Sequence, residues 1–200
     1  MNKKYRKVLL DVLGVFFLVW GIVAISRSMY SQSPMQILYM CYIGLVIIGI
    51  GILTRRSYLI LSQVYIFAIP LVIWDIDFIY WFLFQGPLLG ITDYFFIGEH
   101  SLIGKIVSLQ HLFTVPLGVY IAKKIGIKRY DAWKWSFVQI FLVFLLVILF
   151  TSPEMNINCV YYPCVNFNIG LPYRITWFAL IFGMTFVSSF LINRFILNKK

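Results

Sequence analysis

The polar residues that could do chemistry lie in one part of this sequence, between Trp74 and Cys164. There Asp77, Asp93 and His111 supply two carboxylates and an imidazole, the groups of a general acid–base pair or of a site for a hard metal ion. No metal-binding spacing such as H-x-x-x-H joins them, so the metal interpretation has little support and the residues identify no cofactor. We therefore predict a catalytic set of His111, Asp77 and Asp93.

His111 is the most informative of these residues. It is expected about two turns into an apolar helix over Ile106–Ala122. Ionisable side chains at membrane depth usually face the interior of a helical bundle or a wet cavity. A neutral histidine there can act as a base, a ligand or a hydrogen-bonding strut, and a purely structural histidine between helices is the alternative.

A second group of polar residues is predicted to bind a ligand: Asp75, Thr92, Asn156 and Asn158. Amide, hydroxyl and carboxylate groups beside a cavity suit a sugar or a lipid headgroup. Asp75 and Asp77 are expected to follow the third apolar helix directly, and in an extended turn their side chains would point the same way. The alternatives are solvated residues at a helix end and an ordinary polar loop.

These residues lie in four short strings, which read W-D-I-D-F at 74–78, G-I-T-D-Y-F-F at 90–96, S-L-Q-H-L-F at 108–113 and P-E-M-N-I-N at 153–158. In them the chain resembles an uncharacterised family of small multi-pass prokaryotic integral membrane proteins, which carry similar I-D-F, G-I-T-D-Y, S-L-x-H and P-E-x-N-I-N strings. The resemblance implies no reaction. It implies one functional face that contains Asp77, Thr92, Asp93, His111, Asn156 and Asn158.

Two cysteines, Cys159 and Cys164, are close enough in sequence to close a short loop, in which Pro163 favours a turn. On the outer side of a membrane such thiols can oxidise, so we predict a disulfide between them. The C-x4-C spacing differs from the C-x-x-C of redox enzymes. Cys41 lies inside an apolar run and is expected to pack there.

The elements that must position these residues are expected to be transmembrane helices. The chain is 62% hydrophobic and only 12% charged, whereas a soluble domain has about 25% charged residues. Each of seven apolar runs is near the roughly 20 residues that span a bilayer as a helix. The sequence therefore predicts one domain over residues 1–200, an all-α, polytopic transmembrane helical bundle. The runs are Leu9–Ile25, Gln36–Leu53, Tyr58–Trp74, Phe78–Phe96, Ile106–Ala122, Trp135–Thr151 and Ile175–Leu197.

The positions of the basic residues distinguish six crossings from seven. If Phe78–Phe96 does not cross, only Arg27, Lys105 and Arg174 of the 17 basic residues lie outside. Seven crossings would divide the basic residues almost evenly, and positive-inside bias favours the first arrangement. We predict about six crossings, near residues 9–25, 36–53, 58–74, 106–122, 135–151 and 175–197, with both the N- and C-termini cytoplasmic. The cytoplasmic basic residues would be Lys3, Lys4, Arg6, Lys7, Arg55, Arg56, Lys123, Lys124, Lys128, Arg129, Lys134, Arg194, Lys199 and Lys200.

The fourth run is interrupted by Gln85, Gly86 and Pro87. Proline and glycine disrupt helical hydrogen bonding, and exposed polar backbone is not tolerated in lipid. Its first residues are rich in aromatic side chains, as interfacial segments are. We predict a re-entrant or interfacial segment over 78–96 on the outer face, with a kinked seventh crossing as the alternative.

Three functions fit these features. The first is a multi-pass cell-membrane protein whose outward-facing polar pocket binds a lipid or small molecule, in a binding or transport-associated role. The second is a membrane-embedded enzyme that acts on a lipid-linked substrate through a His/Asp acid–base pair. The third is a structural subunit of a membrane complex. Membrane lipid is the expected partner. The basic residues cluster between apolar runs, which does not favour nucleic acid, and the oligomeric state is not indicated.

Overall fold

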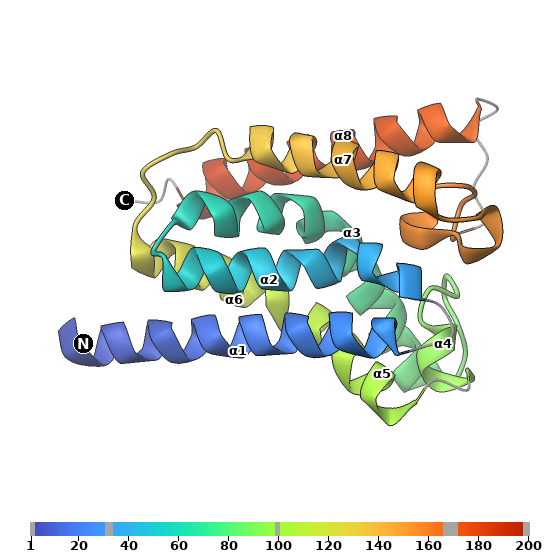
Figure 1. The fold of residues 1–200 in the computed structure, drawn as a ribbon, viewed down its shortest axis with the longest axis horizontal. Coiled ribbons are helices and arrows are strands. Elements are labelled where there is room, and N and C mark those ends of the chain that lie inside the picture. The colour runs from blue at the N-terminus through green and yellow to red at the C-terminus, as the bar shows by residue number, and fades with distance from the viewer. Residues whose placement is uncertain (1–2, 31–33, 99–100, 166–171, 198–200) are drawn as a thin grey trace.

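Six main helices form the bundle in the computed structural model, which describes residues 3–30, 34–98, 101–165 and 172–197. The six lie side by side with their axes roughly along one direction (Figure 1). No strand occurs in the described residues, so the predicted all-α bundle is confirmed. The helices are α1 (Lys3–Met29), α2 (Met40–Leu53), α3 (Ser57–Phe84), α6 (Gln110–Ile125), α7 (Trp133–Phe150) and α8 (Tyr173–Leu191).

Shorter elements gather at the two ends of the bundle. The end where α1 begins carries the π-helix η4 (Ile192–Leu197), and we call it the terminal end. The opposite end, which we call the loop end, carries the remaining short elements (Figure 1). These are η1 (Pro34–Leu38), α4 (Asp93–Phe96), α5 (Leu102–Ser108), η2 (Pro153–Met155) and η3 (Ile157–Cys159).

The helices have the length and surface of membrane spans. Five described segments are long and apolar enough to cross, and α5 continues into α6 as one of them. The apolar helix α2 has 14 residues, or about 21 Å, which is shorter than the roughly 30 Å hydrocarbon core. Large apolar side chains such as Leu142 and Leu149 stay exposed on the outside of the bundle. Lipid is the natural solvent for this surface, and the chain is an integral membrane protein with about six crossings.

The core is built around α3, which contacts α2, α6, α7 and α8. Every residue from Leu61 to Phe67 is buried. Small residues let the neighbouring helices approach closely, as is common between membrane helices. A Cβ added to Gly118 would lie 2.6 Å from Val64, and one added to Gly49 would lie 2.7 Å from the backbone nitrogen of Leu18.

The main difference from the prediction concerns α3, which was expected to end at Trp74 and continues to Phe84. Its 28 residues span about 42 Å, so its last turns extend beyond a hydrocarbon core of about 30 Å. Gln85 caps the helix with a left-handed φ of 55°, and Gly86 and Pro87 follow in the turn. The expected segment over 78–96 is therefore the end of α3, a turn and the short helix α4, with no separate crossing.

Two other helix starts also differ. The second span, expected from residue 36, has a 3-10 turn before α2 begins at Met40. The span expected from residue 106 is preceded by α5 and has a break at Leu109 before α6.

The basic residues of α1 and of the α2–α3 and α6–α7 connections meet at the terminal end. Arg55 forms an ion pair with Asp11 at 2.6 Å, and Arg6 donates to the backbone oxygen of Lys124. At the loop end, Arg27 donates to the Ser101 hydroxyl at 3.3 Å. The fold thus places these basic clusters together, away from Arg27.

Candidate functional site

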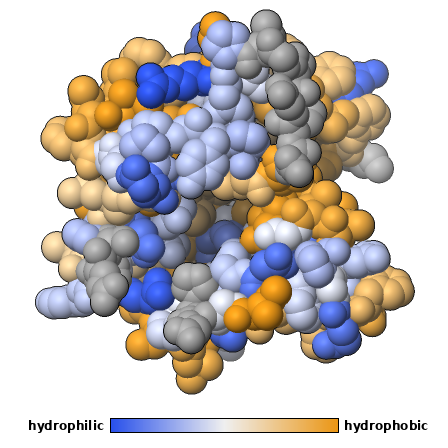
Figure 2. Space-filling model, turned by 90° about the vertical axis from the view of Figure 1, so that its right-hand side faces the viewer, coloured by the Kyte–Doolittle hydropathy of each residue, from blue (hydrophilic) through white to orange (hydrophobic). Residues whose placement is uncertain are grey.

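The predicted site residues lie at the loop end, where α3 and α6 emerge from the bundle. Figure 2 looks directly at this face and shows a hollow at its centre with hydrophilic surface (blue) inside it. Two loop regions lie at this end: the turn that leads from α3 into α4, and the segment that carries η2 and η3 next to the start of α2 (Figure 1).

Asp77 organises the first of these regions. It is fully buried in the last third of α3. One carboxylate oxygen accepts hydrogen bonds from the backbone nitrogens of Leu88 at 3.2 Å and Leu89 at 2.6 Å. The other accepts from the backbone nitrogen and the hydroxyl of Thr92, both at 2.8 Å. Four donors satisfy this buried anion without a cation, so the geometry gives Asp77 and Thr92 a role in holding the turn.

Two tryptophans of α3 hold α4. The indole nitrogen of Trp81 donates to Asp93 at 3.0 Å, and that of Trp74 donates to the Tyr94 hydroxyl at 3.2 Å. The Trp81 ring also stacks on Phe96 with 4.5 Å between centroids. Burial raises the pKa of the Tyr94 phenol.

His111 lies in the first turn of α6. Its ring meets Trp74 edge-on, with centroids 4.6 Å apart and planes at 69°. The Nδ1 atom of His111 is buried and has no hydrogen-bond partner among the described residues. His111 is therefore linked to α4 indirectly, because it contacts Trp74 and Trp74 donates to the Tyr94 hydroxyl.

Asp75 and Asp77 do not point the same way, because α3 does not end at Trp74. Residues two apart on a helix lie on different faces, so the extended-turn pairing was wrong. Asp75 is half-buried, and its Oδ1 atom is buried without a partner among the described residues. With His111 Nδ1 and the side-chain nitrogen of Gln110, it is one of three such buried polar atoms without a partner among the described residues at this end of α3 and α6.

Asn156 and Asn158 use their amides on the chain's own backbone. Asn156 accepts from the nitrogens of Tyr161 and Tyr162 at 3.0 and 3.2 Å, and donates to the Tyr162 oxygen at 2.9 Å. Asn158 donates to the Leu38 oxygen at 2.9 Å and accepts from the Met40 nitrogen at 3.0 Å. Asn158 thereby supplies a partner for the start of α2, which has no side-chain cap from its own N-cap residue.

The predicted disulfide closes the same loop. Cys159 and Cys164 are bonded, with Cα atoms 5.6 Å apart. Asn156, Asn158 and Cys159 all have positive φ, between 38° and 56°. Such backbone is costly for residues other than glycine and is compensated here by the asparagine hydrogen bonds. Cys41 is a free, half-buried cysteine of α2.

A buried polar contact that the sequence analysis missed joins α3 to α7. Gln63 donates to the side-chain oxygen of Gln139 at 2.7 Å, and Gln139 donates back to Gln63 at 3.0 Å. Ser136 adds a bond to the backbone oxygen of Ser62 at 2.7 Å. The available signal was the presence of polar residues inside two otherwise apolar runs.

The structure thus brings the predicted residues into two groups. Asp77, Thr92 and Asp93 lie around the last turns of α3 and His111 contacts Trp74 of the same helix, whereas Asn156 and Asn158 lie in the loop that meets α2. No hydrogen bond among the described residues joins His111 to a carboxylate, and no three described His, Cys, Asp or Glu side chains group to hold a metal ion. Comparison with protein-family models, with curated proteins and with solved structures found no match for the chain.

Proposed function

We propose that the loop end binds a small polar molecule or a lipid headgroup, with His111 and Asp75 as its contacts. Ligand binding or a transport-associated role at the outer face of a cell membrane fits this arrangement. One observation carries the proposal: the buried Nδ1 atom of His111 lacks a partner in the described protein. Leaving such an atom unpaired costs on the order of 1–3 kcal/mol, and a ligand or ordered water would recover that cost.

The neighbourhood supports a shaped site. Trp74 fixes one side of the His111 ring, and its own indole is held by Tyr94. Asp77 fixes the turn that carries α4. A histidine on a rigid wall at the membrane boundary suits recognition of a polar group, because the binding geometry is formed before the ligand arrives.

The proposed orientation places the loop end outside and the termini in the cytoplasm. Its support is the charge distribution, with Arg6, Arg55 and Lys124 together at the terminal end. Cytoplasmic loops carry the excess of lysine and arginine. The Cys159–Cys164 disulfide also suits the oxidising side of a membrane.

The enzyme alternative has weaker support. Asp77 accepts four hydrogen bonds from the turn, and Asp93 accepts one from Trp81. Neither carboxylate is hydrogen-bonded to His111 among the described residues, as an acid–base pair would require. The family resemblance is compatible with a shared face around Asp77, Thr92, Asp93 and His111, and that face remains part of the proposal.

Native mass spectrometry of the protein purified in a mild detergent tests the binding role. We expect the wild type to retain a non-protein mass that His111→Phe loses, because phenylalanine keeps the ring contact with Trp74 and removes both nitrogens. Gln85→Ala, an exposed change at the same end, is the matched control and should retain the mass. Equal retention by wild type and His111→Phe, or no retained mass in either, would argue against the proposal.

A further inference from the structure

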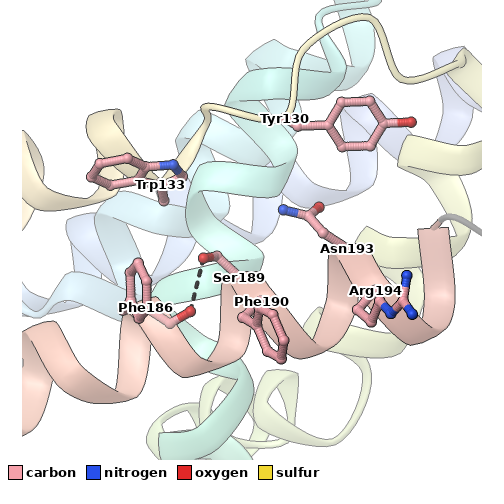
Figure 3. Close-up of a pocket in the computed structure, with 7 residues that line it drawn as sticks. All are labelled: Tyr130, Trp133, Phe186, Ser189, Phe190, Asn193 and Arg194. Carbon is pink, nitrogen blue, oxygen red and sulfur yellow. Dashed lines mark hydrogen bonds between the residues drawn. The ribbon is translucent and has the colours of Figure 1, made fainter.

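A separate pocket of about 280 Å³ lies at the terminal end, between the start of α7 and the end of α8. Figure 3 shows Trp133 and Phe186 on one side of it and Tyr130 and Arg194 on the other, with Asn193 between them. We propose that this pocket binds the phosphate of an anionic phospholipid through Arg194 and Asn193. The inference does not rest on the loop-end site.

Arg194 provides the positive charge. It belongs to the π-helix η4, and π-turns often occur at functional sites. The two ion pairs formed by described residues, Arg55–Asp11 and Arg129–Asp131, do not involve it. A planar guanidinium with several N–H donors matches a phosphate group and can bind two of its oxygens at once.

Asn193 provides a second, oriented donor. The buried Tyr65 hydroxyl of α3 donates to the Asn193 side-chain oxygen at 2.7 Å. With its oxygen held by Tyr65, Asn193 directs its amide nitrogen toward the middle of the pocket (Figure 3). An oriented amide beside a guanidinium forms a small set of donors for one anionic group.

Further polar groups lie on one face of α8, in and beside this pocket. Ser189 lines it and donates to the Phe186 oxygen at 2.8 Å. Thr185 lies one turn earlier on that face and Ser188 beside it. Both are buried, and neither hydroxyl has a partner among the described residues. Buried hydroxyls without a partner are rare, and ordered water would satisfy them.

The apolar part of the lining fits the rest of a phospholipid. Phe186 is 56% exposed and Phe190 58%, so both present aromatic surface to the surrounding lipid. Tyr130 and Trp133 are of the residue types that gather at the level of the headgroups. From the end of the segment inward, Arg194 comes first and Phe190 and Phe186 follow, which matches a phosphate next to an acyl chain. Basic pockets between membrane helices are known to bind such headgroups.

The test measures lipid retention in nanodiscs that contain equal amounts of phosphatidylglycerol and phosphatidylcholine. We expect the wild type to keep phosphatidylglycerol selectively in native mass spectra, and Arg194→Gln to keep about tenfold less, since a charge-assisted bidentate contact is lost. Asn193→Asp is the second variant. It retains an acceptor for Tyr65 and adds a negative charge beside the phosphate, so it should also lose the lipid while the fold is kept.

Arg56→Gln is the matched control, because Arg56 is an exposed cation of the same end that does not line the pocket. Equal loss in Arg56→Gln and Arg194→Gln would overturn the site, since it would show only general attraction between charges. Unchanged retention in Asn193→Asp would also overturn it. A thermal shift that inorganic phosphate alone produces in lipid-free detergent for the wild type, but not for Arg194→Gln, would show that a free anion is the ligand and would overturn the lipid assignment.

Discussion

Thr92 donates to the same carboxylate oxygen of Asp77 twice, from its backbone nitrogen and from its hydroxyl, each at 2.8 Å. Leu88 and Leu89 donate to the other oxygen. A single buried side chain of α3 therefore determines the path of the chain after the helix. The turn carries Asp93 and Tyr94 directly to Trp81 and Trp74, so the position of the whole α4 region depends on this contact.

Asp77→Ala should destabilise the protein by about 2–4 kcal/mol, because several buried backbone donors would lose an ionised acceptor. The free energy of unfolding in mixed micelles with increasing denaturing detergent measures this. Thr92→Val removes only the hydroxyl bond and should cost about 1 kcal/mol.

The double variant separates the shared contact from general damage. Its cost should be less than the sum of the single costs, because the Thr92 hydroxyl has already lost its acceptor in Asp77→Ala. Additive costs would show that the two side chains do not act together.

The Gln63–Gln139 pair gives a second prediction. Its two hydrogen bonds, 2.7 and 3.0 Å long, cross between α3 and α7. A double-mutant cycle of Gln63→Ala and Gln139→Ala should give a coupling energy of about 0.6 kcal/mol, the average between membrane helices, and at most about 1.7 kcal/mol. A coupling near zero would contradict a stabilising role for the pair.

Much of the bundle could be predicted because each crossing is an uninterrupted apolar run, and because few helical arrangements satisfy the charge distribution. The end of α3 could not. Asp75, Asp77, Gly86 and Pro87 indicate a helix end soon after Trp74 under local rules. The buried Asp77 is tolerated inside the helix because the turn returns and supplies its donors. That compensation is a tertiary effect with no signature in the local sequence.

The candidate site shows the same division. The pairing of Cys159 with Cys164 followed from short spacing and a proline between them, and the structure has this bond. The roles of Asn156 and Asn158 depend on chain segments such as Leu38 and Met40 that are far away in sequence. The approach of Trp74 to His111 depends on how α3 and α6 pack, which periodicity alone does not determine.

The disulfide yields a third prediction. Cys159 and Cys164 are separated by five positions, so a loop-entropy estimate gives about 2 kcal/mol of stabilisation. Protein purified without reductant should gain two alkyl groups at these cysteines only after reduction. Cys159→Ser/Cys164→Ser should be less stable by about that amount. Two free thiols before reduction would contradict the bond.

The orientation yields a fourth prediction. In a Cys41→Ala background, Glu154→Cys should react in intact cells with a maleimide that does not cross membranes, whereas Lys128→Cys should react only after permeabilisation. Both positions are exposed and lie at opposite ends of the bundle. The reverse pattern would place the termini outside and contradict the proposed topology.

The fifth prediction concerns His111. Its interpretations as a structural strut and as a ligand-binding residue predict different changes in the free energy of unfolding on mutation. A structural strut needs partners for its nitrogens, yet Nδ1 is buried without one among the described residues. If the nitrogen serves a ligand, His111→Phe in ligand-free protein should leave the free energy of unfolding unchanged or raise it by up to about 1 kcal/mol, because an unpaired buried polar atom is removed. Substitution of a binding residue commonly stabilises a protein while it removes function.

Phe113→Ala provides the matched control, since Phe113 packs against Phe16, Phe17 and Trp20 and its loss should cost about 3–5 kcal/mol in the same assay. A loss of 1 kcal/mol or more in His111→Phe would instead indicate that the imidazole holds the helices together. Stability kept or raised, together with loss of the retained mass, would identify His111 as a binding residue, because Phe113→Ala shows that the assay detects lost packing nearby.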